Sequence, residues 1–181
     1  SNNRTLQHLL ASFSPKLRKK LLQKSREGRL QPGGEKSEVT ILMSDLRGFT
    51  RASAKLDSEA VVAMLNDYFS VLGDIIFQHD GTIDKFIGDA ILAVFGSPEP
   101  DRDHALKAVR AALAMQESIA GINERRRAKN LPCCDLGIGV HTGEVLHGFI
   151  GASERLEFTV IGDTVNKASR YCDGAAAGEI V

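Results

Sequence analysis

The chain has 181 residues, 43% of them hydrophobic, and equal numbers of basic and acidic residues, 23 of each. This length and composition suit one globular domain with a core and a short additional segment. The longest apolar runs, such as 90–95, are far shorter than the roughly 20 residues that a membrane-spanning helix needs, and the chain does not open with a secretory signal. Its three cysteines form neither a CxxC pair nor an even disulfide framework, so we expect a cytoplasmic protein whose domain is not embedded in a membrane.

Charge is distributed unevenly along the chain. Residues 1–36 contain nine Lys and Arg against two Glu, so the remainder is acidic overall. A basic segment can bind nucleic acid or a membrane surface. The basic residues of 16–26 are not interleaved with aromatic residues, however, and such charge runs are usually solvated helix faces. We therefore expect no nucleic-acid partner.

Residues 1–36 are predicted to form a helical prefix and a linker. Apolar residues recur at mostly three- and four-residue steps in 5–24, interrupted by Ser14-Pro15, which can start a second helix. The segment 31–34 (QPGG) is typical of a linker. We place the main domain at 37–181.

The main domain is predicted to run strand, helix, hairpin, helix, strand. Apolar runs and hydrophobic periodicity indicate a strand from 38, a helix at 57–78, strands at 82–87 and 90–95, a helix at 103–127, a strand at 135–141, a hairpin of 145–150 with 158–161, a helix at 163–171 and a strand beginning at 179. This order is the split βαββαβ arrangement. The predicted class is α+β, with a ferredoxin-like, antiparallel-rich sheet and helices on one face.

Two acidic residues lie where predicted strands end. Asp45 follows the first strand, and Asp89 lies at the hairpin tip after Gly88. Because the first strand is central in this topology and the hairpin lies beside it, both carboxylates can reach one point in space. Oxygen-only ligands suit Mg²⁺ or Mn²⁺ rather than zinc. Aspartate is equally common in turns and as a helix cap, so these two positions alone leave the interpretation open.

Two further segments carry chemistry that suits a nucleotide. The glycine in Leu46-Arg47-Gly48-Phe49-Thr50 leads into a helix directly after Asp45 and offers backbone N–H groups to a polyphosphate. Asn166 and Arg170 lie four residues apart, on one helical face, where an amide and a cation suit a ribose and a phosphate that gains charge. By spacing alone, a solvated helix face is the more common explanation of this second pair.

Four motifs, in their order and spacing, resemble the class III adenylyl and guanylyl cyclase family. They are 44–50 (SDLRGFT), 84–90 (DKFIGDA), 139–145 (GVHTGEV) and 159–170 (TVIGDTVNKASR). The resemblance covers about residues 37–181, and the prefix resembles the helical lead-in of bacterial members. It implies the class III cyclase fold and a head-to-tail homodimer with two composite sites, each binding ATP and two Mg²⁺ or Mn²⁺ ions.

The resemblance also implies which residues hold the metals and phosphates. Asp45 and Asp89, with the backbone carbonyl of Leu46, match the metal ligands. The backbone of 48–50 matches the loop that holds the departing pyrophosphate. These residues come from one chain of the dimer.

The partner chain supplies the remaining residues of each implied site. Lys85 and Thr159 match the pair that reads the purine, Asn166 the residue that orients the ribose, and Arg170 the residue that stabilises the transition state at the α-phosphate. Lysine only donates hydrogen bonds, so Lys85 fits N1 of adenine, which accepts, and not N1 of guanine, which donates. The Thr159 hydroxyl accepts or donates, so the preference for ATP depends mainly on Lys85.

The predicted reaction is attack of the ribose 3′-oxygen on the α-phosphate, which forms cyclic AMP and releases pyrophosphate. A guanylate cyclase and a catalytically silent regulatory or dimerisation module stay open as alternatives. A diguanylate cyclase is a further rival, although its hairpin carries paired acids where 87–90 (IGDA) has one. We also expect a regulatory domain upstream of residue 1, able to attach the full-length protein to a membrane, and a chain that lacks the C-terminal end of the catalytic domain.

Overall fold

The computed structural model describes residues 7, 9–152 and 155–181 and folds them around one antiparallel sheet. The sheet has five strands in the order β2-β3-β1-β4-β5, so the first strand is central, as predicted. The strands are β1 (Gly33–Arg47), β2 (Thr82–Ile87), β3 (Ala90–Phe95), β4 (Asp135–Ala152) and β5 (Arg155–Ile161). The helices are α2 (Pro15–Arg26), α3 (Phe49–Ser53), α4 (Ser58–Gln78), α5 (His104–Ala128) and α6 (Asp163–Gly174). The α+β class is confirmed.

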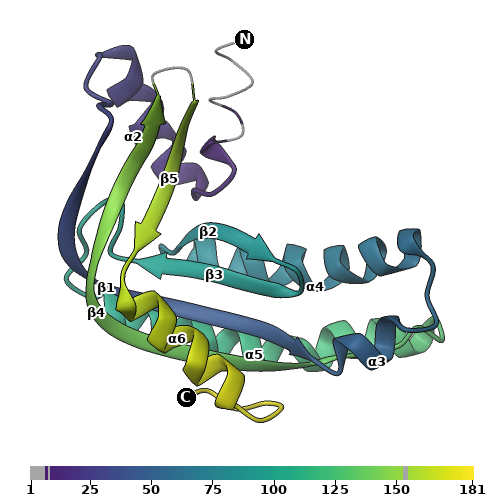
Figure 1. The fold of residues 1–181 in the computed structure, drawn as a ribbon. Helices are drawn as coiled ribbons and strands as arrows, with labels where there is room; N and C mark the ends of the chain where they lie inside the picture. Colours follow the sequence, from purple (N-terminus) through teal and green to yellow (C-terminus); the bar gives the residue numbers. More distant parts are fainter. Residues whose placement is uncertain (1–6, 8, 153–154) are drawn as a thin grey trace.

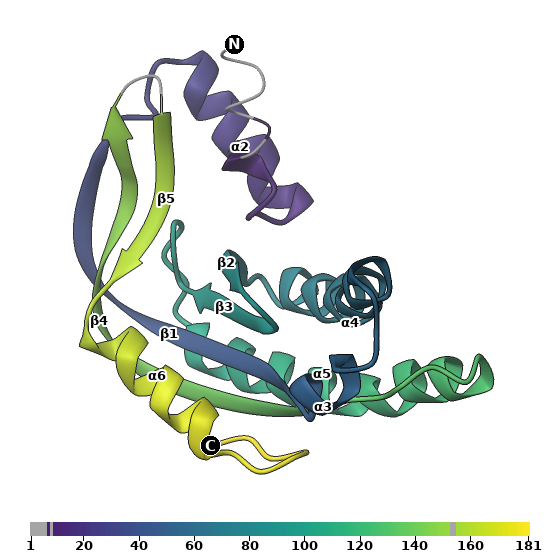
Figure 2. The same ribbon diagram turned by 45° about the vertical axis from the view of Figure 1, so that its right-hand side comes forward.

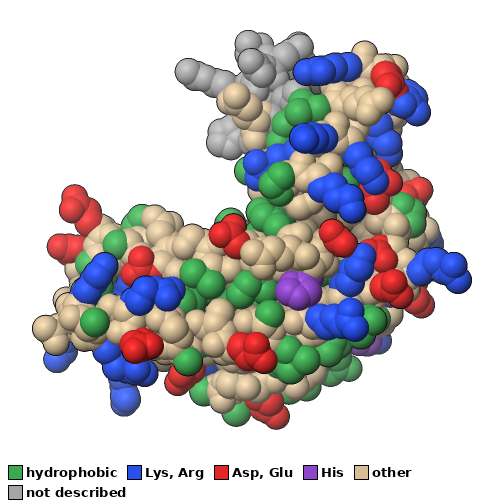
Figure 3. Space-filling model, turned by 180° about the vertical axis from the view of Figure 1, so that it is seen from behind, with side chains coloured by type: hydrophobic (Ala, Val, Ile, Leu, Met, Phe, Trp, Pro, Cys, Tyr) green, Lys and Arg blue, Asp and Glu red, His purple; other side chains and the backbone are tan. Residues whose placement is uncertain are grey.

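Strands β1 and β4 are long and join two parts of the molecule. Their pairing runs from Gly33 opposite Phe149 to Arg47 opposite Asp135. One end of the pair lies beside β2 and β3, and the other end rises with β5 as an arm toward α2 (Figure 1). The arm and the main sheet together form an L (Figure 2). Lys and Arg side chains gather on the arm, where the basic prefix lies (Figure 3).

The two long helices cover one face of the sheet. Helix α4 begins after Asp57, whose carboxylate accepts a hydrogen bond from the backbone N of Ala60 at 2.8 Å. Its buried residues recur at helical spacing and pack with α5 against β1, β3 and β4. By length and a hydropathy of 1.5, α4 is also the one helix among the described residues that would be long and apolar enough to cross a membrane. In this fold its buried side chains belong to the core.

Helix α6 lies on the opposite face, so the prediction of helices on one face is wrong. Ala168 and Cys172 of α6 pack in a second core with Val39, Ile41 and Met43 of β1. This same core extends along the arm to the prefix helix α2. All of residues 39–43 are buried. A strand whose apolar residues are not confined to alternate positions is typical of cover on both faces, and the run 39–43, in which Thr40 is the one polar residue, was the available signal.

Several element bounds differ from those predicted. Strand β1 begins at Gly33, inside the predicted linker, and β4 is one continuous strand where two were expected. Pairing in the arm depends on glycine, because a Cβ at Gly148 would lie 2.1 Å from the carbonyl oxygen of Gly33. The strand expected from 179 is a single parallel bridge between Ile138 and Ile180. The helix start at Ser14-Pro15 is confirmed, whereas the division between prefix and domain at 36/37 stays a prediction.

Gly139 has no room for a side chain, because α6 packs directly on β4. A Cβ there would lie 2.3 Å from the backbone N of Cys172 and 2.4 Å from the carbonyl oxygen of Ala168. Since backbone atoms cannot rotate away, we expect Gly139→Ala to lower the free energy of unfolding by about 1–3 kcal/mol. Gly174→Ala is the matched control, because a Cβ at Gly174 meets nothing within 4 Å. Urea unfolding measures both variants, and a Gly139→Ala protein as stable as the control would contradict this packing.

Candidate active site

The structure places the two predicted metal-binding acids together at the end of β1. The β1–β3 register pairs Ser44 with Ile91, which brings Asp45 beside the β2–β3 turn. Gly88, with φ of 60°, makes this turn possible. Oδ2 of Asp89 then accepts a hydrogen bond from the backbone N of Leu46 at 3.1 Å. The hairpin tip is thus tied to the strand end that carries Asp45.

The electrostatics at Asp45 suit a divalent cation. Burial raises the pKa of this carboxyl, the Arg47 guanidinium lowers it, and Asp89 and Asp173 raise it. Arg47 Nη1 donates to Oδ2 at 3.1 Å and lies 2.9 Å from the buried Oδ1, which forms an ion pair with it but makes no hydrogen bond with the described residues. A partly buried acid that lies beside a second acid and has an oxygen without a hydrogen bond is a fitting ligand for Mg²⁺ or Mn²⁺.

These acids would leave a metal ion with open coordination positions. Among the described residues, no group of three or more His, Cys, Asp and Glu side chains is placed to hold a metal ion. Mg²⁺ is usually bound through one or two carboxylates plus substrate phosphates, so two acids and a backbone carbonyl fit this mode. The geometry therefore favours a site that is completed by a phosphorylated ligand.

The predicted phosphate loop leads from β1 into the short helix α3. Gly48 is the N-cap residue of this helix, with φ of 81°, and as a glycine it provides no side-chain cap. A Cβ at Gly48 would meet nothing within 4 Å, so the backbone there is open. Uncapped N–H groups in the first turn, including those of Phe49 and Thr50, are suited to an anion.

The two residues predicted to read the purine lie on the edge strands, Lys85 on β2 and Thr159 on β5. These strands contact each other across the bend of the sheet. The Lys85 side chain is 54% exposed, and its nearest acidic partner is Asp84 at 3.9 Å. Thr159 is half-buried and lies opposite Gly148 in the β4–β5 ladder. Within the described part of the chain, no hydrogen bond joins Lys85 to Thr159.

Asn166 and Arg170 lie together on the exposed side of α6. The Arg170 side chain is 68% exposed, and its ion pair is with Asp163 at 3.8 Å. In the described ranges, neither residue makes a hydrogen bond or ion pair with Asp45 or Asp89. One chain thus brings the two predicted metal ligands, Asp45 and Asp89, together and presents the remaining predicted site residues separately.

Asp84 is a residue to which the sequence reasoning gave no role. Its side chain is 2% exposed, and its buried Oδ2 has no hydrogen-bond partner among the residues that the structure describes. It lies at the register shift between Ile83 and Lys85, where the β2–β3 ladder is irregular. Burial raises its pKa to about 6, and Lys85 opposes this shift. No local pattern marked it, because the start of β2, 82–85 (TIDK), contains only one apolar residue.

The raised pKa of Asp84 predicts a pH dependence of stability. Between its ordinary pKa of about 3.9 and about 6, the folded protein binds a proton that the unfolded chain has released. The contribution of Asp84 to the free energy of unfolding therefore falls by about 2–3 kcal/mol as the pH rises through this window. Asp84→Asn should lack this slope, and Asp74→Asn, at an exposed position of α4, should keep it. Urea titrations from pH 4 to 8 test the prediction, and parallel profiles for wild type and Asp84→Asn would refute it.

The comparisons with known proteins place this chain in one family. The family model for the adenylate and guanylate cyclase catalytic domain matches residues 32–181, and the chain belongs to this family. Adenylate cyclase 1 of Rhizobium meliloti (strain 1021) is 43% identical over 135 residues, which make up 75% of this chain and 20% of that protein. The chain therefore spans about a fifth of the length of this curated relative.

Two solved structures show the same fold. The guanylyl cyclase Cya2 is 42% identical with a TM-score of 0.78, and the match covers 82% of this chain and 75% of that one. The adenylyl cyclase CyaB from P. aeruginosa is 34% identical with a TM-score of 0.76, over 82% of this chain and 77% of that one. The relatives thus include cyclases named for either purine, so the choice of purine must be argued from the site.

Proposed function

We propose that the chain is the catalytic domain of an adenylate cyclase, which converts ATP into cyclic AMP and pyrophosphate. The observation that carries this proposal is the placement of Asp45 and Asp89 at one point, with Asp89 hydrogen-bonded to Leu46, in a chain of the cyclase family. We infer that the domain acts in the cytoplasm, within a longer protein that also carries a regulatory domain.

Asp45, Asp89 and the Leu46 carbonyl would hold two Mg²⁺ or Mn²⁺ ions. Such ions, when bound, lower the pKa of the ribose 3′-hydroxyl and neutralise charge on the phosphates. The backbone N–H groups of 48–50 would hold the pyrophosphate as it leaves. Asn166 would orient the ribose, and Arg170 would stabilise the charge that develops at the α-phosphate, an effect of about 3–4 kcal/mol for one preorganised donor.

We further propose a head-to-tail homodimer in which each site takes its metal acids from one chain and the other side chains from its partner. Apolar side chains exposed on α4 and the hairpin support such an interface. Phe86 is 51% exposed and stacks on Phe69 with ring centroids 4.6 Å apart. Val62 and Ile87 are also largely exposed. Exposed apolar patches of this kind mark interaction surfaces.

A guanylate cyclase is the second candidate, favoured by the 42% identity to Cya2. The hydrogen-bonding capacity of Lys85 argues against it. An ammonium group has three donors and no acceptor, so it satisfies N1 of adenine and leaves the N1–H of guanine unpaired. An unpaired polar group in a closed site costs binding energy.

Changing the purine-reading pair tests the preference for ATP. Lys85→Glu combined with Thr159→Cys replaces the donor at N1 with an acceptor, so the ratio of kcat/KM for ATP to that for GTP should fall at least about tenfold. Overall activity should also fall. Lys129→Glu, at the C-cap of α5, is the charge-matched control. An unchanged ratio in the double variant would remove Lys85 and Thr159 from the purine site.

A further inference from the structure

Arg47 joins one of the metal acids to the end of α6. Its Nη1 donates to Oδ2 of Asp45 at 3.1 Å and lies 2.9 Å from Oδ1. Its Nε donates to the carbonyl oxygen of Ala175 at 3.0 Å, and Nη2 donates to the carbonyl oxygen of Cys172. Both carbonyls lie at the C-terminal end of α6, where the backbone N of Ala175 also donates to the Cys172 carbonyl at 3.1 Å.

The neighbouring backbone leaves space for this guanidinium. Gly137 lies opposite Asp45 in the β1–β4 ladder. A Cβ at Gly137 would lie 2.7 Å from Arg47 Nε and 2.8 Å from Nη2, so the guanidinium occupies the place of a side chain on β4. The Arg47 side chain is only 26% exposed. A planar guanidinium can bond a carboxylate and two carbonyls at once, which the single ammonium of lysine does less well.

We propose that Arg47 is a positioning residue that couples metal binding at Asp45 to the placement of α6. A divalent cation on Asp45 would repel the guanidinium and compete with it for the same carboxylate oxygens. Arg47 would then shift its bonding toward Cys172 and Ala175. Helix α6 presents Asn166 and Arg170. The position of its C-terminal end would thereby depend on whether a metal ion is bound at Asp45.

In the head-to-tail dimer this coupling would connect the two active sites. Asp45 would serve one site, whereas Asn166 and Arg170 of the same chain would serve the other. Binding of metal in one site would therefore adjust the phosphate-stabilising residues of the second. This connection between the two active sites rests on the proposed function. The contacts of Arg47 with Asp45 and with the end of α6 do not depend on it.

Hydrogen exchange tests the coupling without any assay of activity. Amide exchange over residues 172–178 would be followed by mass spectrometry with and without Mn²⁺, while electron paramagnetic resonance measures the bound Mn²⁺. In the wild type, Mn²⁺ should change exchange in this segment severalfold. In Arg47→Gln, exchange there should be faster without metal, and the response to Mn²⁺ should be lost although Mn²⁺ still binds. Arg47→Lys, which retains the charge, should keep part of the response.

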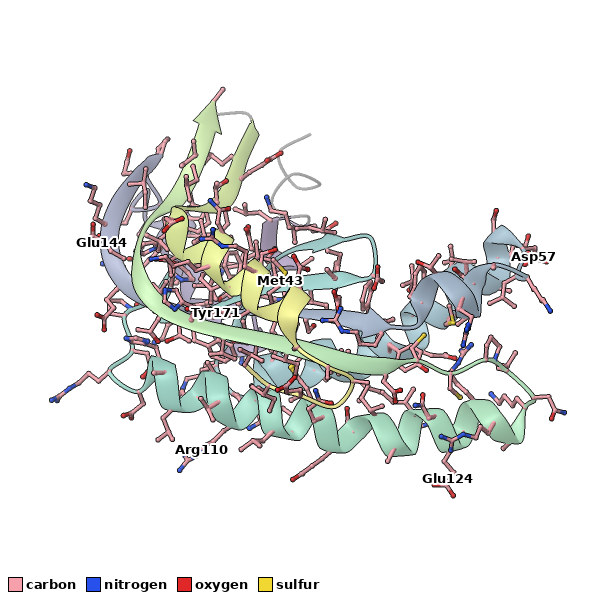
Figure 4. All side chains as sticks on the ribbon, turned by 60° about the horizontal axis from the view of Figure 1, so that its bottom comes forward. Met43, Asp57, Arg110, Glu124, Glu144 and Tyr171 are labelled. Carbon is pink, nitrogen blue, oxygen red and sulfur yellow. The ribbon has the colours of Figure 1, made fainter. Side chains whose placement is uncertain are left out.

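The matched control is Arg110→Gln, because Arg110 is an exposed residue of α5 whose side chain points outward from the molecule (Figure 4). It should behave as the wild type. If Arg47→Gln and Arg47→Lys both kept the full response to Mn²⁺, the guanidinium would be only structural and the proposal would be overturned. Mn²⁺ that binds to the wild type without changing exchange at 172–178 would also overturn it. A wild type that binds no Mn²⁺ would refute the metal site itself, and with it both proposals.

Discussion

Asp45→Ala and Asp89→Ala are each expected to lower kcat for cyclic AMP formation about a thousandfold or more, equivalent to at least about 4 kcal/mol of transition-state stabilisation. The two carboxylates are the only side chains proposed as metal ligands, so losing either removes half of the charge that holds the ions. Both residues are partly exposed at the end of the sheet. The variants should therefore remain folded, as circular dichroism and thermal unfolding would show.

Glu124→Ala is the matched control for the loss of an acid, since Glu124 is exposed on α5, away from β1 (Figure 4). It should retain wild-type rates. Near-normal turnover by Asp89→Ala under Mg²⁺ would show that the hairpin tip does not hold a metal, and the two-metal assignment would be wrong.

Two inactive variants, Asp45→Ala and Lys85→Ala, are expected to restore activity when they are mixed. In a head-to-tail dimer of one chain of each kind, one site receives both lesions and the other receives neither. With random pairing at equal concentrations, half of the dimers are mixed and each has one intact site of two. The mixture should therefore reach about a quarter of wild-type activity.

The control pair is Asp45→Ala with Asp89→Ala. Both lesions then affect the metal half of the site, so every mixed dimer carries one lesion in each site and no recovery is expected. If Asp45→Ala with Lys85→Ala also failed to recover, although mass spectrometry showed exchange of subunits, the site would be built within one chain or the pairing would not be head-to-tail.

The sequence predicted the meeting of Asp45 and Asp89 because both signals were local. A buried strand that ends in an acid and a Gly88-Asp89 turn each determine where a carboxylate lies, and the topology brings the hairpin beside the first strand. The hairpin of 145–150 with 158–161 was predicted and is confirmed as the pairing of β4 with β5. The part of the arm that β1 contributes was missed, for a local reason too. Gly33-Gly34 has the composition of a linker, but this segment pairs closely with Gly148, whose own lack of a side chain allows the approach.

Arg47 and Asp84 could not be found in this way. The bonds of Arg47 reach Cys172 and Ala175, which are 125 and 128 residues further along the chain. The spacing of residues in the sequence does not predict a contact between residues so far apart in the chain. Asp84 is buried because of the irregular pairing of β2 with β3 at Ile83 and Lys85. The residue pattern of a short strand does not predict such an irregularity. The roles of the other predicted site residues stay predictions, because within one chain they do not contact Asp45 or Asp89. These residues are Lys85, Thr159, Asn166 and Arg170.

Identification of the product tests the central claim most directly. The wild-type chain would be incubated separately with ATP and with GTP, under Mg²⁺ and under Mn²⁺, and the nucleotides analysed by mass spectrometry. The account predicts cyclic AMP from ATP at a kcat/KM well above that for cyclic GMP from GTP. Cyclic GMP as the main product, a cyclic dinucleotide, or no cyclic product under either metal would contradict it.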